Sequence, residues 1–153
     1  MRRRRVEREV APGDDRVTGG FELLEHQADV GVRAWGETLA EACEQAAWAV
    51  ADILGARGTG PGARRAIRVT GTDEGGVLVD FLNELLLLHE TEDPGFAAIL
   101  VRSATPTALE AEVELVPLSD ATEGIPVKAA TFHRLRVEHR PDGSIEARVY
   151  LDV

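Results

Sequence analysis

The segment from residue 76 to residue 90 constrains the fold most, because the helix it predicts is apolar on nearly every side. One polar stripe interrupts it, formed by Asp80, Asn83 and Glu84 at the i, i+3, i+4 spacing of a helix face. A helix this apolar is expected to be mostly buried. Its carboxylates then either face water or line a site, and for Asp80 we expect water.

Strand patterns surround this helix and one other. The other helix starts after Thr38, which can form a capping box with Glu41, and Gly55 ends it. Strands are predicted over residues 21–26, 30–36, 65–71, 96–103, 109–118, 128–139 and 145–153. Residues 96–103 are apolar on both faces, which suggests an inner strand. The order predicts an α+β domain with two helices packed on a largely antiparallel sheet, and helix followed by strand occurs twice, which hints at a duplicated unit.

The distribution of charge separates a short tail from an acidic body. Residues 1–18 hold six Arg and four acidic residues, a net of +2, so the other 135 residues carry −12 of the total of −10. We expect 1–18 to be a disordered basic tail and 19–153 to be one domain. A body this acidic repels phosphate backbones, which disfavours strong direct binding to nucleic acid. On charge alone, a net charge that only keeps the protein soluble is the favoured interpretation, and any role in RNA chemistry is expected to depend on a partner.

Neither a membrane span nor a secretory signal is predicted, since no apolar run approaches the roughly 20 residues of a span and none follows the N-terminal Arg run. A cytoplasmic protein is expected. The single cysteine, Cys43, excludes an internal disulfide and a cysteine-rich zinc site. It lies in the apolar stripe of the first helix, where a small buried hydrophobe is the favoured interpretation.

Titratable groups gather in three further places. His26 and Asp29 lie three residues apart between two strands, as a binding pair or as a turn in which Asp29 caps backbone N–H groups. Lys128 is the only lysine of the chain and suits a single acceptor, or is an accident of an Arg-rich composition. His133 falls in a predicted strand and is either functional or structural.

The last two residues form an unusual pair of anions. Asp152 stands beside the free carboxylate of Val153, and adjacent anions repel unless a cation holds them. The alternative is a frayed end, against which the strand pattern up to Val153 argues. Carboxylate oxygens suit a hard cation such as Ca²⁺, Mg²⁺ or Mn²⁺.

Four motifs in this order resemble the archease family over roughly residues 19–153. They are HQADVGVRAWG from residue 26, LVDFLNELLLL from residue 78, GIPVKAATFHRLRVE from residue 124 and ARVYLDV from residue 147. Gln27 stands where the family often has Thr, and Phe132 where it often has Tyr. Neither departure removes a candidate ligand.

The resemblance implies a duplicated strand-helix-strand-strand (SHS2-like) fold and a divalent metal held by Asp29, Asp152 and the Val153 carboxylate. It also implies a helper of the RtcB-type RNA ligase, which joins 2′,3′-cyclic-phosphate or 3′-phosphate ends to 5′-hydroxyl ends in tRNA splicing and RNA repair. The helper promotes guanylylation and repeated turnover of the ligase, and the ligase, not the helper, uses GTP. The lysine that matches Lys128 is functionally linked in the family. As residues for partner contact or activation we take Lys128, His26, Glu84 and His133.

Two other function classes compete with this interpretation. A hydrolase or transferase could use His26, Asp29, Lys128 and His133, although no nucleophile motif such as GxSxG is present. A general chaperone, or a modulator of an RNA-modifying enzyme, would need a large exposed apolar patch.

Overall fold

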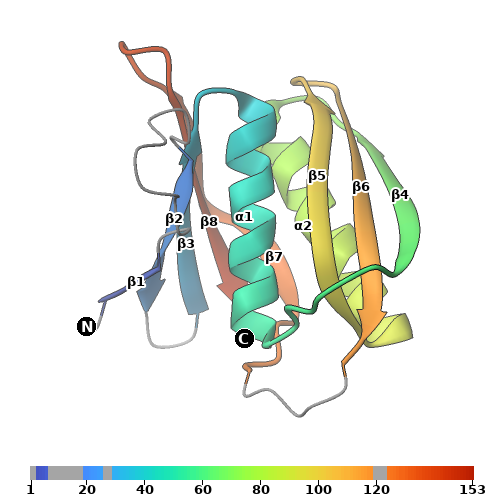
Figure 1. Ribbon diagram of the computed structural model, residues 1–153. Helices are drawn as coiled ribbons and strands as arrows, with labels where there is room; N and C mark the ends of the chain where they lie inside the picture. The colour runs from blue at the N-terminus through green and yellow to red at the C-terminus, as the bar shows by residue number, and fades with distance from the viewer. Residues whose placement is uncertain (1–2, 7–18, 26–28, 119–123) are drawn as a thin grey trace, which may run out of the picture.

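The computed structural model describes residues 3–6, 19–25, 29–118 and 124–153, in which two helices lie between two antiparallel sheets (Figure 1). The five-stranded sheet has the order β1 (Arg3–Val6), β2 (Gly20–Glu25), β3 (Asp29–Gly36), β8 (Ile145–Asp152), β7 (Ala129–His139). The three-stranded sheet has the order β4 (Ala63–Thr70), β6 (Ala108–Pro117), β5 (Pro94–Ala104). The helices are α1 (Leu39–Leu54) and α2 (Glu74–Glu92). The predicted α+β class with antiparallel strands is confirmed, and the strands form two sheets rather than one.

Two units of the same topology build this fold. The elements β4, α2, β5 and β6 follow one another in the chain, and in their sheet β6 pairs with both β4 and β5. The elements β3, α1, β7 and β8 repeat that order, as β3-β8-β7. We call the first set the inserted unit and the second the outer unit, because the inserted unit lies in the sequence between α1 and β7. The duplicated strand-helix-strand-strand arrangement is therefore nested.

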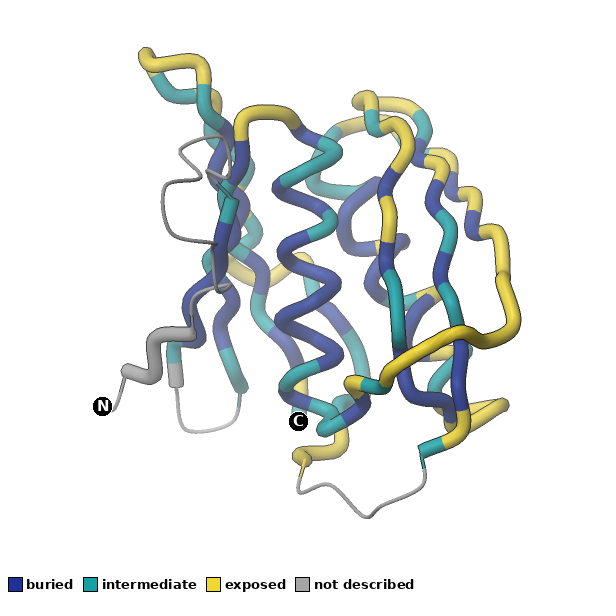
Figure 2. The backbone as a smooth tube through the Cα atoms, viewed as in Figure 1, coloured by how far each residue is buried: buried dark blue, intermediate teal, exposed yellow. Residues whose placement is uncertain are grey.

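Helix α2 is covered on most sides, as its sequence predicts. It packs chiefly against β7 of one sheet and also against β4 of the other. Its buried side chains are Val77, Leu78, Val79, Phe81, Leu82, Leu85 and Leu86. Its exposed positions are Asp80, Glu84, Leu87 and, in the last turn, Glu90, Thr91 and Glu92, so Asp80 faces water as expected (burial is coloured in Figure 2). Neither described helix is long and apolar enough to cross a membrane.

Helix α1 begins and ends where its capping residues predict. The Thr38 side chain accepts a hydrogen bond of 3.1 Å from the backbone N–H of Glu41. Gly55 takes the left-handed conformation (φ 65°) and its N–H closes the last turn onto Asp52. The helix packs between β3 and β5, so both of its long sides are covered.

The prediction of an inner strand over residues 96–103 is wrong, because β5 is an edge of the three-stranded sheet. Its apolar character has another cause: α1 and the segment after it cover this edge. The Glu44 carboxylate accepts a hydrogen bond of 2.9 Å from the backbone N–H of Val101, and the N–H of Phe96 donates to the Ala56 carbonyl at 2.6 Å. A covered edge and an inner strand give the same sequence pattern.

One part of the tail that was expected to be disordered is a β-strand. Residues Arg3–Val6 form β1, which pairs antiparallel with β2 and extends the five-stranded sheet. The other residues of the tail, 1–2 and 7–18, lie outside the described part of the chain.

Candidate functional site

The pairing of β3 with β8 brings two candidate ligands together, since Asp29 and Asp152 are direct register partners. Opposite residues of an antiparallel pair point to the same face, with Cβ atoms about 4.5–5.5 Å apart. Leu151, which precedes Asp152 on β8, is buried in the core. Because side chains alternate along a strand, both carboxylates lie on the outer face of the sheet. Asp29 is half-buried and Asp152 is exposed. Two like charges in this position destabilise a sheet, which makes the pair a natural place for a cation.

Lys128 and Val153 lie at the same end of the five-stranded sheet, the lower end in Figure 1. The backbone N–H of Lys128 donates a hydrogen bond of 2.8 Å to the carbonyl of Asp152, and the next residue, Ala129, is the register partner of Asp152 on β7. The side chain of Lys128 is exposed and makes no ion pair with any described residue. Four predicted site residues thus meet at one sheet end: Asp29, Lys128, Asp152 and Val153.

These residues provide donors for a hard cation but not a complete side-chain cluster. Among the described residues, no group of three or more His, Cys, Asp or Glu side chains lies together in a way that could hold a metal ion. A metal held at this end would therefore need a donor besides Asp29 and Asp152. The carboxylate expected on Val153 is such a donor, and all three are oxygen ligands of the kind that Ca²⁺, Mg²⁺ and Mn²⁺ accept.

The other predicted residues are not brought to the carboxylate pair. His133 is exposed and lies in an irregular stretch of β7, where the register jumps from Thr131–Tyr150 to Arg136–Arg148. Glu84 is an exposed residue of α2. His26 lies outside the described residues.

A residue that sequence reasoning passed over, Asn83, connects α2 to the candidate site. Its amide makes two hydrogen bonds with the backbone of Ala130: Nδ2 donates to the carbonyl at 3.2 Å, and the backbone N–H donates to Oδ1 at 2.8 Å. These bonds satisfy the open edge of β7 two residues after Lys128. The signal was present in the sequence, as the one amide in the polar stripe of an apolar helix.

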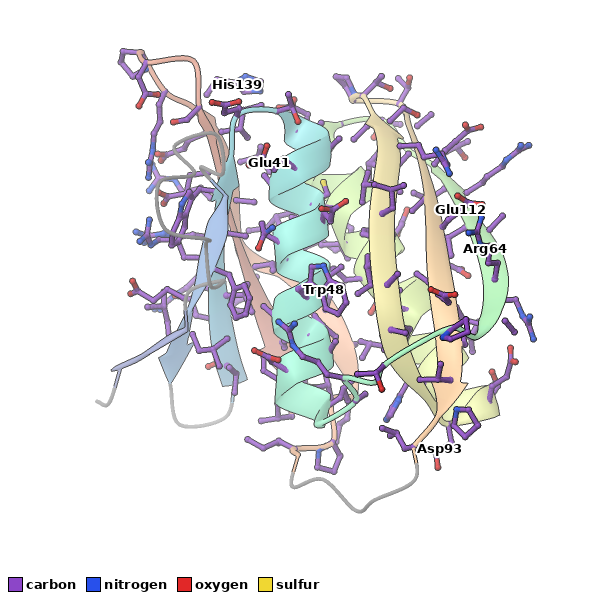
Figure 3. All side chains as sticks on the ribbon, viewed as in Figure 1. Glu41, Trp48, Arg64, Asp93, Glu112 and His139 are labelled. Atoms are coloured by element: carbon purple, nitrogen blue, oxygen red, sulfur yellow. The ribbon has the colours of Figure 1, made fainter. Side chains whose placement is uncertain are left out.

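Beside this sheet end lies a pocket of about 580 Å³, between the C-terminal parts of α1 and α2 and the segment 124–128. Asp93, which caps the C-terminus of α2, marks the same lower end in Figure 3. The segment is held close to α1: the N–H of Ile125 donates to the Ile53 carbonyl at 2.8 Å, and a Cβ on Gly124 would lie 2.1 Å from the Leu54 oxygen. Only glycine fits there, so the pocket wall is fixed against the helix end.

The pocket wall is mostly apolar, with three polar side chains. Leu54, Leu86, Ile125, Pro126 and Val127 contribute the apolar part, and His89, Glu90 and Lys128 the polar part. The Nδ1 atom of His89 is buried and has no hydrogen-bond partner among the described residues. Lys128 therefore belongs to the sheet end through its backbone and to the pocket through its side chain.

The lone thiol takes no part in this site. Cys43 is buried in α1, and burial raises its pKa to about 12, with a smaller contribution from the negative charge of Glu74. The thiol therefore stays protonated at neutral pH, as the prediction of a structural cysteine requires.

The sequence of this chain is similar to that of one protein family. The model of the Archease protein family (MTH1598/TM1083) matches residues 21–153. The archease of Thermococcus gammatolerans is 34% identical over 139 residues, covering 87% of this chain and 98% of that protein. The archease of Methanothermobacter thermautotrophicus is 33% identical over 143 residues, covering 88% and 99%.

Two solved structures share the fold. The solution structure of Methanobacterium thermoautotrophicum protein 1598 superposes with a TM-score of 0.70 at 30% identity, covering 87% of this chain and 98% of that one. The crystal structure of a Thermotoga maritima archease, described as a possible chaperone, superposes with a TM-score of 0.60 at 19% identity, covering 85% and 94%. At that lower identity the second likeness shows the fold alone.

Proposed function

The chain belongs to the archease family, and on that premise we propose that it activates an RtcB-type RNA ligase without being an enzyme itself. It promotes guanylylation of the ligase and lets one ligase molecule complete many turnovers. The observation that carries the proposal is the pairing of Asp29 with Asp152 at the sheet end where Lys128 and Val153 also lie. We call this sheet end, with Asp29, Lys128, Asp152 and Val153, the tip. An acidic, exposed tip of this kind can enter a basic partner site.

A divalent cation completes the tip in this proposal. Asp29, Asp152 and the Val153 carboxylate would hold it, and when bound its two positive charges would offset two of the three negative charges, which relieves the repulsion between the carboxylates and leaves the tip acidic. The chain's own residues do the positioning. The β3–β8 register sets Asp29 against Asp152, and the hydrogen bond from the Lys128 N–H to the Asp152 carbonyl joins the start of β7 to the end of β8.

Lys128 has the second role, which is to meet an anion on the ligase or on the nucleotide that the ligase uses. Its exposure and the lack of an ion pair with any described residue leave its ammonium group available. The charge of the whole chain, −10, supports recognition of a protein rather than of bare RNA. A ligase must be basic where it holds RNA, so opposite charge would speed and orient the encounter.

The placement of the candidate residues favours this function over the two alternatives. A hydrolase built on His26, Asp29, Lys128 and His133 would need these groups around one reacting atom, but His133 lies in the irregular part of β7, away from the Asp29–Asp152 pair in the register. A general chaperone would need one broad apolar patch. The large exposed apolar residues described here are four: Leu87, Leu100, Ile125 and Phe132.

A turnover assay tests the proposal. Limiting cognate ligase, GTP, Mn²⁺ and a broken RNA with 2′,3′-cyclic-phosphate and 5′-hydroxyl ends are mixed with this protein below the RNA concentration. We expect many turnovers with the protein and about one without it, together with faster labelling of the ligase by radioactive GTP. Asp152→Asn and Lys128→Ala should lose most of the stimulation.

The control is Glu110→Gln, an exposed carboxylate on β6 of the other sheet, which should stimulate like the wild type. Equal turnover by the ligase with and without the protein would refute the proposal. So would full stimulation by both site variants.

A further inference from the structure

The pocket beside the sheet end has a chemistry that the proposed function does not use. Its walls are largely apolar, while Lys128, Glu90 and the part-buried His89, whose Nδ1 atom has no hydrogen-bond partner among the described residues, are the polar residues that line it. Its volume of about 580 Å³ lies within the roughly 300–1,000 Å³ of pockets that bind ligands. The pocket also lies at the same sheet end as the candidate ligands. The segment 124–128 that forms its wall includes Lys128, whose backbone N–H donates a hydrogen bond to the Asp152 carbonyl.

One exposed apolar side chain lines the pocket, and a second lies on α2 next to residues that line it. Ile125 lines the pocket and is 50% exposed, and Leu87 is 52% exposed. Leu87 follows Asn83 by one helical turn and precedes Glu90 by another, so it shares the face of α2 that runs from β7 to the pocket. Of the four large exposed apolar residues among those described, Ile125 therefore lines the hollow, and Leu87 lies on α2 between the lining residues Leu86 and His89 in the sequence. Exposed apolar side chains around a preformed hollow mark a surface for another protein.

The pocket is preformed, because hydrogen bonds hold its wall in position. Its wall is attached at one end through Ile125 to the last turn of α1 and at the other through Lys128 to Asp152. Asn83 fixes the following strand to α2. A partner side chain that enters this space meets a surface that needs little ordering, which reduces the entropic cost of binding.

We propose that this pocket is a second docking point for the RNA ligase, which inserts an apolar side chain there with a neighbouring carboxylate that pairs with Lys128. The inference rests on the proposed function, since it names the part of this protein that holds the same partner. A second copy of this chain is the weaker occupant, because two bodies of charge −10 repel each other. A ligase with a basic RNA site has the opposite charge, and the pocket adjoins the tip that would enter that site.

The test separates docking strength from activation. Stimulation of ligase turnover is measured over a range of concentrations of this protein, and affinity for the ligase is measured by calorimetry. In Ile125→Asp and in Leu87→Asp, the concentration for half-maximal stimulation should rise at least tenfold, while the maximal stimulation is unchanged. Lys128→Ala should lower the maximum as well. Melting temperature and Mn²⁺ affinity of the two docking variants should match the wild type.

A matched control is Leu100→Asp. Leu100 has a similar exposure, 45%, but lies on β5 of the other sheet and does not line the pocket, so this variant should behave like the wild type. If the wild type stimulates the ligase and both docking variants do so at unchanged half-maximal concentration, the pocket proposal is wrong and the proposed function stands. If the wild type gives no stimulation, both are wrong. If the protein alone is a dimer that Ile125→Asp dissociates, the occupant is a second copy and the proposal is overturned.

Discussion

The outer and inserted units have the same strand order but carry different chemistry at corresponding positions. The outer unit begins its β3–β8 pairing with Asp29 opposite Asp152, whereas the inserted unit begins its β4–β6 pairing with Ala63 opposite Leu115. The same backbone pairing can therefore carry a candidate site in one unit and none at the corresponding pair of the other. Substitution of one cross-strand pair turns an ordinary sheet end into a candidate cation site.

The outward faces of the two sheets also differ, because their ion pairs are buried to different extents. On β3, Arg33 contacts Glu22 at 3.3 Å and Glu146 at 3.0 Å, and both of these carboxylates are buried. On the corresponding strand β4, Arg68 contacts Glu110 at 3.4 Å, and both side chains are mostly exposed. Buried charges depend on their partners, whereas exposed pairs are screened by water. Ion pairs should therefore matter in the outer unit and hardly in the inserted one.

The largest effect should come from removing Arg33. Arg33→Met leaves the buried Glu146 with only Arg140 and Arg148 of its three ion-pair partners, and we expect a loss of roughly 3 kcal/mol in the free energy of unfolding. Arg68→Met, its counterpart in the inserted unit, should lose about 0–1 kcal/mol. Urea denaturation followed by tryptophan fluorescence measures both. Equal losses would show that burial does not distinguish the two faces.

The next effect concerns the two sheet ends. A divalent cation at about 100 times its dissociation constant should stabilise the wild type by roughly 2.7 kcal/mol, since only the folded chain joins Asp29 to Asp152. Asp29→Asn should lose most of this stabilisation, and so should one residue added after Val153, which converts the expected carboxylate into a peptide carbonyl. Thermal unfolding with and without Ca²⁺ or Mn²⁺ gives the values. Glu110→Gln, in the inserted unit, is the control, and a cation effect that survives in both site variants would exclude the shared ligands.

The two units are linked by a reciprocal exchange of hydrogen bonds. Helix α1 of the outer unit sends Glu44 to the edge strand β5 of the inserted unit. Helix α2 of the inserted unit sends Asn83 to the edge strand β7 of the outer unit. The second link has two bonds and lies next to the candidate site, so the comparison predicts unequal effects.

The smallest effects should come from breaking these links. Asn83→Ala leaves the N–H and the carbonyl of Ala130 without their partners and should cost about 1–3 kcal/mol, whereas Glu44→Ala should cost about 1 kcal/mol. Only Asn83→Ala should also reduce stimulation of the ligase, because Ala130 follows the segment that carries Lys128. Chemical denaturation and the turnover assay measure the two outcomes. A functional loss in Glu44→Ala of the same size would contradict this assignment.

Much of the fold was predictable because it follows from short-range patterns. The seven predicted strands and both helices are confirmed, with Thr38 and Gly55 at the ends of α1. The starts and ends shifted by a few residues. Helix α2 begins after Asp73, whose carboxylate accepts a hydrogen bond of 2.7 Å from the N–H of Gly76, so two glycines lie in its first turn. Local propensity disfavours glycine in a helix, and capping outweighed it here.

The candidate site could be predicted only as separate pieces. The sequence singled out Asp29, Lys128 and the Asp152–Val153 pair separately, and the resemblance to the archease family grouped Asp29, Asp152 and Val153 as metal ligands. The structure places all four at one sheet end. Periodicity does not place residues from the two ends of a chain side by side. It also did not single out Asn83 within the polar stripe of α2, since only the contact with Ala130 distinguishes this amide from its neighbours, and Glu84 stays a prediction.

The sequence by itself determined both helices, seven of the strands, the caps of α1, the burial of α2 and the family. These properties depend on side chains within one or two turns of each other, or on motifs in fixed order. The tertiary structure alone decided that the strands divide into two sheets, that one unit is inserted in the other, and that β5 is an edge. It also formed the pocket and set Asp29 opposite Asp152. Strand pairing is chosen by packing between distant segments, because the backbone hydrogen bonds that join strands are the same whatever side chains they carry.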